Sequence, residues 1–426
     1  MASIRERNGK FNVIYSYTNE KGERKQKWET YETKAEAKRR KKEIEYKKEM
    51  GSFVVRKCKT LDELITEYVA LYGKENWALS TYEGNVSLIN NYILPIIGDT
   101  KLSEINTRFI ERYYQSLLKR RAVINPLNKT SRNEFVSSST VRDINKLLRN
   151  CFEQAVKWEL MEKNPCTHAT VPKHKSQKRD IWTADTLMYA LSVCEDERLK
   201  LAINLSFSCS LRLGELLGLT WDCVDTSDPD HVVINIRKSL ARLNCENIED
   251  TGGREIIFQF PTVLGRGLNK TVRVLKVPKN PTSIRKVYLS QTARMLLREL
   301  KEAQTTDKTA YGDDYHDYNL VFAQHNGDPL EDEYMSRHFK LFVKEHDLHM
   351  IDFYALRHSG ATAKLRGTRN LKAVQGDMGH ATPEMLTKVY AAIVDEDRVH
   401  NADVIEESVL AKIQQKTQNM DDKYSR

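Results

Sequence analysis

Residues 199–225, LKLAINLSFSCSLRLGELLGLTWDCVD, decide how the C-terminal half of this 426-residue chain is organised. The stretch predicts an apolar helix, a short break at residues 208–210 and a second helix that begins near Leu213. Arg212 precedes that second helix, and Glu215 follows Arg212 by one turn. Such a pair is either an ordinary i, i+3 ion pair or the oriented charge of a functional site.

The chain beyond this stretch mixes strands and helices. HVVINI (231–236) and KVYLS (286–290) lie in strand-rich sequence, with an irregular excursion between them at about residues 241–270 that contains EDTGG. After residue 320 the pattern is helical again. We therefore expect a mixed α/β domain over residues 181–401, followed by a C-terminal helix and a polar tail over 402–426.

The first residues of the chain predict a small sheet with one helix. KFNVIYSY (10–17) and RKQKWETY (24–31) both alternate apolar and polar residues, and TNEKGE supplies a turn between them. Thr33 and Glu36 have the spacing of a capping box, which opens a Lys- and Arg-rich helix that runs to about residue 50. A three-stranded sheet packed on one helix can bind a DNA groove, so we interpret residues 1–55 as a DNA-binding domain that uses Lys25, Lys27 and Trp28.

The charge distribution supports a polyanionic partner. The net charge is +9, and residues 1–57 alone hold 17 Lys and Arg against 9 Glu and no Asp. Almost all of the excess therefore lies in the first eighth of the chain. Cations placed on phosphates release condensed counterions, which favours nucleic acid; a solvated charged surface is the alternative interpretation.

Residues 58–165 predict a domain of four amphipathic helices. Thr60 with Glu63 forms a second capping box, and Ser80 with Glu83 repeats that pattern before a helix expected to stop at Pro95.

Two further helices are expected at 107–119 and 139–159, joined by a polar loop. A basic linker over 166–180 follows. The sequence thus predicts a multidomain α+β protein with a small three-stranded sheet plus helix, a four-helix domain and a mixed α/β domain.

The sequence argues against a membrane protein and against a protein stabilised by disulfide bonds. No run of about 18 apolar residues occurs, and the N-terminus lacks the apolar core of a secretion signal. The seven cysteines are odd in number and include no CxxC pair, so neither a disulfide framework nor a zinc ribbon is indicated. We expect a soluble, intracellular protein.

Four motifs carry basic, histidine and tyrosine side chains in a fixed order. LRLGE supplies Arg212, VPKNPTSIRKVYLS supplies Lys279, DFYALRHSG supplies Arg357, and GHATPEMLTKVY supplies His380 and Tyr390. The order and spacing resemble the tyrosine recombinase family of phage and conjugative-transposon integrases. Residues 1–55 are similar to the arm-type DNA-binding domain of transposon integrases. Residues 90–118 are similar to their core-binding domain, and residues 181–401 to their catalytic domain.

The resemblance implies a role for each residue. Arg212 and Arg357 would donate hydrogen bonds to the non-bridging oxygens of a phosphodiester. Lys279 would protonate the departing 5′ oxygen, although Lys276 lies three residues away and competes for that role.

Tyr390 would attack the phosphate and form a 3′-phosphotyrosyl link, and His380 would hydrogen-bond the phosphate. Glu215 and His358 would orient the site. No metal, ATP or other cofactor is implied.

One position departs from the family pattern. The family commonly has His three residues before the second arginine, where this chain has Tyr354. A tyrosine, with an ordinary pKa near 10, is a poor general base at neutral pH, so the proton acceptor for Tyr390 is left unassigned. Tyr354 is also a second phenol that can in principle compete as nucleophile.

Three hypotheses follow for function. The favoured one is a site-specific recombinase that integrates and excises mobile DNA. The others are a relaxing enzyme similar to type IB topoisomerases, which would not need residues 1–55, and a DNA-binding protein on a catalytically inactive recombinase scaffold. The sequence distinguishes neither transposon from prophage origin nor the attachment site.

The resemblance further implies partners. The expected partner is double-stranded DNA at core and arm sites, on which the protein would form a homotetramer. Whether an accessory excision factor is needed is an open question. No membrane partner is implied, and the expected location is the bacterial cytoplasm, in association with the nucleoid. A C-terminal apolar stripe would dock onto a neighbouring subunit or cap its own domain; its residues are Val404, Ile405, Val409, Leu410 and Ile413.

Overall fold

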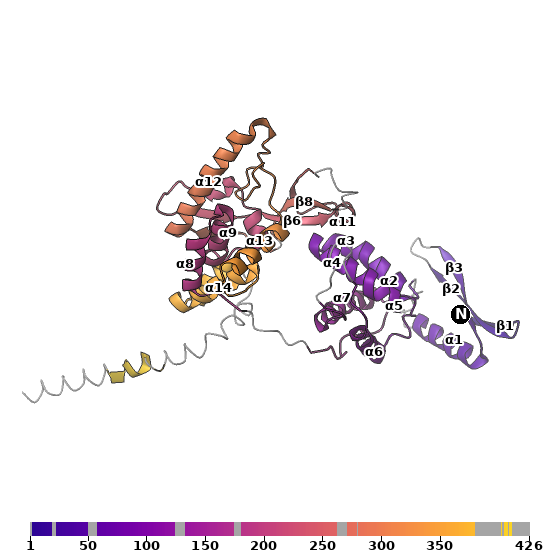
Figure 1. Cartoon of the computed structure of the whole chain (residues 1–426). Coiled ribbons are helices and arrows are strands. Elements are labelled where there is room, and N and C mark those ends of the chain that lie inside the picture. Colours follow the sequence, from indigo (N-terminus) through magenta and orange to yellow (C-terminus); the bar gives the residue numbers. More distant parts are fainter. Residues whose placement is uncertain are drawn as a thin grey trace, which may run out of the picture. The chain divides into compact units, whose positions relative to one another are not determined.

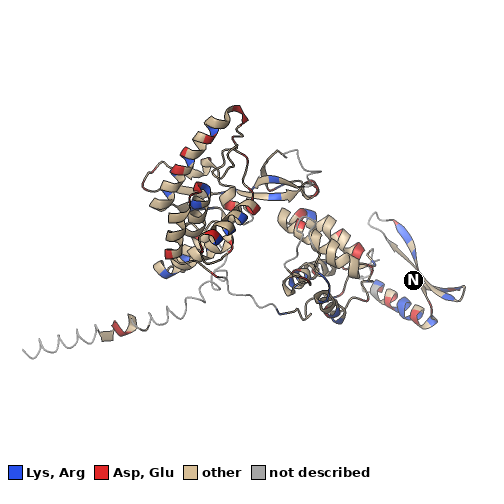
Figure 2. Cartoon of the chain, viewed as in Figure 1, with Lys and Arg blue, Asp and Glu red and all other residues tan. Residues whose placement is uncertain are grey.

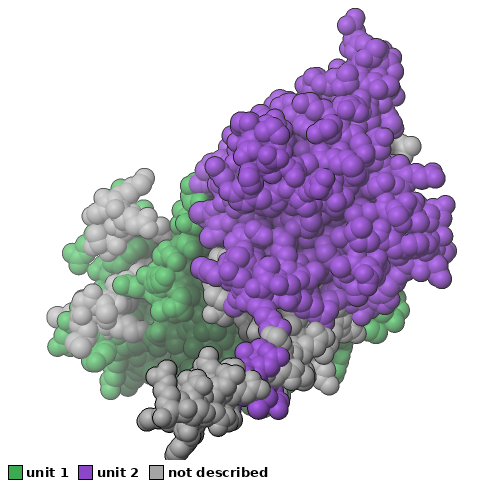
Figure 3. All heavy atoms as spheres, turned by 90° about the vertical axis from the view of Figure 1, so that its left-hand side faces the viewer, with its two compact units in different colours: residues 1–77, 81–175 green, residues 78–80, 176–426 purple. Residues whose placement is uncertain are grey.

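The computed structural model of the chain divides into two compact units. Residues 1–77 and 81–175 form the first unit, and residues 78–80 and 176–426 form the second (Figure 3). The structure describes residues 2–18, 23–49, 58–123, 133–173, 180–261, 271–278 and 280–379, together with 402, 404–407, 409 and 410. Within these residues no helix combines the length and the hydropathy needed to span a membrane.

The chain begins with a three-stranded antiparallel sheet and one helix, as predicted. Strands β1 (Ser3–Arg7), β2 (Lys10–Thr18) and β3 (Arg24–Tyr31) pair in the order β1-β2-β3, and α1 (Lys34–Glu49) packs on one face (Figure 1). The predicted capping box is present, since the Glu36 amide lies 3.3 Å from the Thr33 hydroxyl and the Thr33 amide 3.2 Å from the Glu36 carboxylate.

A partly buried carboxylate ties α1 to this sheet. Glu29 on β3 accepts a hydrogen bond from Arg40 Nε at 2.8 Å and from the hydroxyl groups of Tyr15 and Tyr31. Burial alone would raise the pKa of Glu29, but the bonds from Arg40 and Tyr15 outweigh it and lower that pKa to about 2. The face of the sheet that carries Glu29 is therefore the face that α1 covers.

Four helical segments follow, built around one apolar core. They are α2 (Leu61–Tyr68) continued by a π-turn (Val69–Gly73) and α3 (Lys74–Asn76), α4 (Leu79–Leu88) continued by a π-turn (Ile89–Ile93) and α5 (Leu94–Ile97), α6 (Thr107–Leu118), and α7 (Ser138–Lys157). The Thr60 capping box is complete, and the apolar faces of these helices form the core. Cys166, Ala169 and Val171 also pack there, so the start of the expected linker belongs to this unit.

Two details of the sequence prediction are wrong. Helix α4 begins at the buried Leu79, so Ser80 lies inside its first turn and does not cap it. The chain also remains helical through Pro95, which lies in the first turn of α5 behind a π-turn. Proline is tolerated there because its missing N–H would have no partner in a first helical turn.

The second unit is built around the buried helix α9 (Glu197–Ser208). Helices α8 (Ala184–Val193), α12 (Gln291–Tyr311), α13 (Asp332–Glu345) and α14 (Phe353–Thr368) contact it, and α10 (Leu213–Leu217) follows the predicted break (Figure 1). A small sheet has the order β4 (Val224–Asp225), β5 (Val233–Ile236), β9 (Arg285–Tyr288). Helix α15 (Leu371–Met378) comes last before residue 379.

The excursion at 241–270 is more regular than predicted. Strand β6 (Ser239–Asn244), helix α11 (Cys245–Thr251) and strand β7 (Ile256–Gln259) occupy its first part, and β8 (Thr271–Lys276) follows. The three strands form a second antiparallel sheet in the order β6-β8-β7. Leu240 and Leu243 of β6 and Val272, Val274 and Leu275 of β8 are buried, so tertiary packing stabilises strands that the local sequence signals only weakly.

The predicted C-terminal stripe is described only in part. Val404, Ile405, Val409 and Leu410 are helical and exposed, and Ile413 lies outside the described residues. Docking of this stripe stays a prediction.

Helices α9 and α14 meet so closely that one glycine is required. A Cβ added at Gly360 would lie 1.7 Å from the carbonyl oxygen of Phe207, whereas one added at Gly367 in the same helix would meet nothing within 4 Å. This contact sets the position of the segment of α14 that carries Arg357.

We expect Gly360→Ala to lower the free energy of unfolding by about 3 kcal/mol, because helix backbones must separate to admit a methyl group. Gly367→Ala should be neutral or stabilise by up to about 1 kcal/mol through helix propensity. Urea unfolding of both variants followed by circular dichroism tests this, and an equal effect of the two substitutions would contradict it.

Candidate active site

The break after α9 places Arg212 and Glu215 together. Arg212 is the residue that precedes α10, and its backbone N–H donates to Glu215 Oε2 at 3.0 Å. Its side chain donates from Nη1 to Glu215 Oε1 at 2.6 Å. The same carboxylate therefore caps the helix and holds the guanidinium, as the sequence spacing suggested.

Arg357 reaches the same carboxylate from α14. The side chain is 1 % exposed, and its two terminal nitrogens donate to the carbonyl oxygens of Ser210 and Met378. Nη1 also lies 3.9 Å from Glu215 Oε2. The buried Nε–H has no acceptor among the described residues, so this guanidinium keeps one donor for a further group.

A third guanidinium completes the cluster and was not predicted. Arg285 on β9 donates from Nη2 to Glu215 Oε2 at 2.9 Å, from Nε to the carbonyl oxygen of Asp377 at 2.7 Å, and from Nη1 to that of Ser283 at 2.9 Å. Its side chain is 7 % exposed. A single arginine in a short strand has no local signal that separates it from a surface residue.

The cluster holds three positive charges around one negative charge. Burial alone would raise the pKa of Glu215, but Arg285 and Arg212 outweigh it and lower that pKa, so the carboxylate is ionised at neutral pH. Burial and the neighbouring Arg212 lower the pKa of Arg357 to about 9, which leaves it protonated at neutral pH. The site therefore presents a net charge of about +2 and is suited to an anionic group.

Tyr354 and His358 lie on the same helix as Arg357. Tyr354 is one turn earlier on α14, 41 % exposed, and its ring meets the His358 ring edge to face at 5.0 Å between centroids. Tyr354 thus occupies the neighbourhood of the arginine cluster where the sequence pattern placed it.

Three predicted residues, Lys279, His380 and Tyr390, lie outside the described residues, and their roles stay predictions. The competing Lys276 is described: it ends β8, is 8 % exposed, and has its Nζ 3.4 Å from Glu255.

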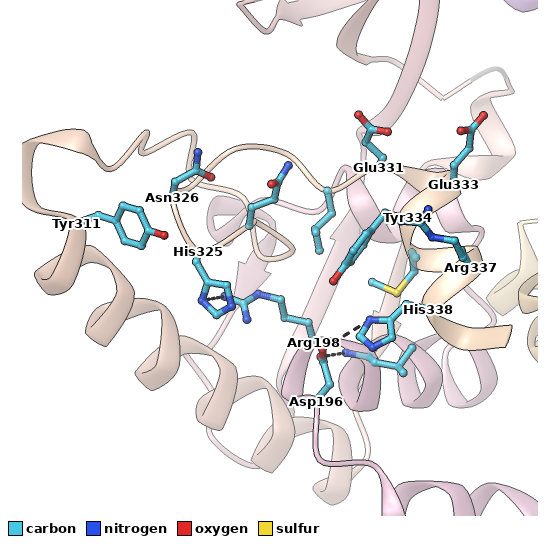
Figure 4. A pocket seen from close by; sticks show the side chains of 14 residues that line it. Asp196, Arg198, Tyr311, His325, Asn326, Glu331, Glu333, Tyr334, Arg337 and His338 are labelled. Atoms are coloured by element: carbon cyan, nitrogen blue, oxygen red, sulfur yellow. Dashed lines mark hydrogen bonds and ion pairs between the residues drawn. The ribbon is translucent and has the colours of Figure 1, made fainter. Parts of the chain in front are cut away.

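A separate pocket of about 740 Å³ lies at the other end of α9. Figure 4 shows Arg198 at its floor, with His325 and His338 on either side and Tyr334 above. Arg198 is ion-paired to Asp307 at 2.6 Å. Ten residues separate Arg198 from the C-terminal residue of α9, about 15 Å along a helix, so this pocket is not part of the arginine cluster.

Across the described ranges, no three His, Cys, Asp or Glu side chains lie close enough together to hold a metal ion.

Comparisons with known proteins identify relatives of this chain. The profile of the phage integrase family matches residues 266–397, and that of the phage integrase N-terminal SAM-like domain matches residues 60–118. The chain is 23% identical over 334 residues to a XerC-like tyrosine recombinase of Caldanaerobacter subterraneus, with 76% of each chain covered. It is a tyrosine recombinase of the phage integrase family.

Further similarities support this assignment. The recombinase is 22% identical over 328 residues to the ICEBs1 integrase of Bacillus subtilis, which covers 76% of this chain and 77% of that protein. Its fold matches the Tn1549 transposon integrase in complex with a circular intermediate DNA, with a TM-score of 0.59 at 17% identity over 80% of this chain and 100% of that one. A lambda integrase tetramer bound to a Holliday junction matches with a TM-score of 0.50 at 15% identity, over 91% and 94% of the two chains.

Glu215→Gln is expected to lower the free energy of unfolding by about 3 kcal/mol at pH 7, because it leaves buried arginines without their counter-charge. The folded pKa of Glu215 is lowered, so its contribution is complete above its ordinary pKa of about 4.3 and is lost as pH falls through the lowered value.

The free energies of unfolding of the wild type and of Glu215→Gln should therefore approach each other as pH falls from about 5 to about 3. Urea unfolding across this range measures it, with Glu302→Gln on the exposed surface of α12 as control. A difference that does not depend on pH would contradict the assigned charge.

Proposed function

We propose that this tyrosine recombinase integrates and excises a mobile DNA element by cutting and rejoining DNA through a 3′-phosphotyrosyl link to Tyr390. The observation that carries the proposal is the convergence of Arg212 and Arg357 on Glu215, with the buried Nε–H of Arg357 left without an acceptor among the described residues. Two oriented guanidiniums fit the non-bridging oxygens of a phosphodiester, which gain negative charge during displacement.

The remaining steps rest on residues outside the described ranges. The phenol of Tyr390 gives up its proton to an acceptor that is left unassigned, and its oxygen bonds to phosphorus. The bond from phosphorus to the 5′ oxygen breaks, and Lys279 gives that oxygen a proton. Lys276 is buried beside Glu255, which supports Lys279 for this task. His380 hydrogen-bonds the phosphate, and Tyr354 lies one turn from Arg357 as a further hydrogen-bonding group.

Similar proteins support the mobile-element part of the proposal. The Tn1549 transposon integrase is named for a transposon and is bound to a circular intermediate DNA, and the ICEBs1 protein is likewise named an integrase. We extend this to the present chain as binding of double-stranded DNA at a core site. The lambda integrase tetramer on a Holliday junction supports a homotetramer on DNA.

The N-terminal sheet offers a second DNA-binding surface. Residues opposite one another in an antiparallel pair share a face, and Tyr17 and Tyr15 lie opposite Lys25 and Lys27. Because Tyr15 is buried against α1, both lysines lie on the side of the sheet that faces α1, whereas Trp28 lies on the opposite face and is 47 % exposed. The three residues predicted to bind DNA together are thus divided between two faces.

The open face is basic and carries the exposed tryptophan. Figure 2 shows Lys and Arg along the strands. The register and the alternation of side chains place four exposed cations and the exposed tryptophan on this face: Arg5, Arg7, Lys10, Arg24 and Trp28. We propose that this open face, and not the face packed on α1, binds arm-site DNA.

Arg24→Gln should weaken arm-site binding and lower the slope of log K against log salt by about 1, because one phosphate contact is lost. The neighbouring Lys25→Gln removes an exposed cation from the other face and should leave the slope unchanged. Fluorescence anisotropy over a salt series measures both. The reverse result would assign DNA binding to the face that carries α1.

A nicked suicide duplex that carries the attachment sequence should trap a covalent adduct on Tyr390, because the released 5′ fragment diffuses away. Tyr390→Phe should abolish the adduct, and Tyr354→Phe, the matched loss of a phenol, should retain it. Denaturing electrophoresis and peptide mapping locate the link. Salt-sensitive DNA binding with no adduct in the wild type would instead indicate an inactive recombinase scaffold.

A further inference from the structure

Arg285 is the least expected member of the arginine cluster. Its guanidinium is almost fully buried, and all three of its nitrogens donate hydrogen bonds within the protein. With 7 % of its side chain exposed it is largely shielded from solvent, unlike Arg212, whose side chain is 30 % exposed. A side chain in this state can act on the reaction only through the groups that it holds.

The first of these groups is Glu215. Its Oε1 accepts from Arg212 at 2.6 Å, and its Oε2 accepts from Arg285 at 2.9 Å, with Arg357 Nη1 farther away at 3.9 Å. Arg285 therefore satisfies the oxygen that would otherwise attract Arg357. With Glu215 neutralised in this way, the charges of Arg212 and Arg357 remain for an anionic substrate.

The second group is the end of α15. Arg285 Nε donates to the carbonyl oxygen of Asp377, and a Cβ added at Gly379 would lie 3.2 Å from Arg285 Cδ and 3.2 Å from its Nη1. Gly379 itself has a positive φ of 58°. The backbone therefore turns tightly against this arginine immediately before the segment in which His380 is predicted to act.

We propose that Arg285 is a positioning residue for DNA cleavage, which binds the Glu215 oxygen that lies nearest Arg357 and fixes the end of α15 against β9. This inference rests on the proposed function. It predicts that loss of Arg285 slows the chemical step more than it weakens DNA binding, because the side chain does not face the substrate. A purely structural residue would instead lower stability and the active fraction without changing the rate of the active molecules.

The test compares full-length Arg285→Gln and Arg285→Lys with wild type. Single-turnover cleavage of the suicide duplex at saturating DNA gives the rate, anisotropy gives Kd, and thermal melting reports folding. We expect Arg285→Gln to slow cleavage roughly 100-fold, the order that follows from a misplaced catalytic group, with Kd within about threefold of wild type. Arg285→Lys should recover part of the rate, because an ammonium group can still pair with Glu215.

Arg237→Gln is the matched control. Arg237 follows β5, the neighbour of β9, and pairs with Asp222 at the surface, with its side chain 48 % exposed. It should cleave at the wild-type rate.

A double mutant separates action through Glu215 from independent action. Glu215→Gln with Arg285→Gln should be no slower than the slower single mutant, because both changes break the same pair. The inference would be overturned if the rate losses of the two single mutants multiplied in the double mutant, or if Arg285→Gln cleaved at the wild-type rate. Either result would leave the proposed function intact. A wild-type protein that forms no adduct would overturn the proposed function and this inference together.

Discussion

One buried carboxylate organises the site. Glu215 is 3 % exposed, and a carboxylate in that position is costly unless several cations and N–H groups surround it. The chain meets this need by bringing together Arg212, Arg285 and Arg357 from three segments that lie far apart in the sequence. The positive charge available to a phosphate thus follows from the need to surround one buried carboxylate with cations. This arrangement exists only when the break after α9, strand β9 and helix α14 are all folded in place.

The sequence predicted the parts of this arrangement that have local signals. The pair Arg212 and Glu215 was visible from its spacing, and the break near residue 210 from the change in helical pattern. Arg285 was not predicted, because its partners are 70 and 92 residues away and a short strand offers no sign of which side chain turns inward. Lys279, His380 and Tyr390 lie outside the described residues, so for them the sequence pattern remains the only basis.

Element types were easier to predict than their ends and their faces. The capping boxes at Thr33 and Thr60 formed as expected, whereas the helix around Pro95 continued because π-turns and favourable first-turn positions removed the cost of proline. In the N-terminal sheet the alternation was read correctly, but the sequence did not reveal which face α1 covers. That face is decided by the contacts of Tyr15 and Glu29 with α1, which are long-range.

Gly379 limits how this recombinase can be engineered. Its φ of 58° favours glycine, and a Cβ there would also lie 2.9 Å from the carbonyl oxygen of Thr282. A library that randomises the segment after α15 in search of altered activity would therefore lose most of its folded members to this one codon. Holding residue 379 as glycine avoids this loss.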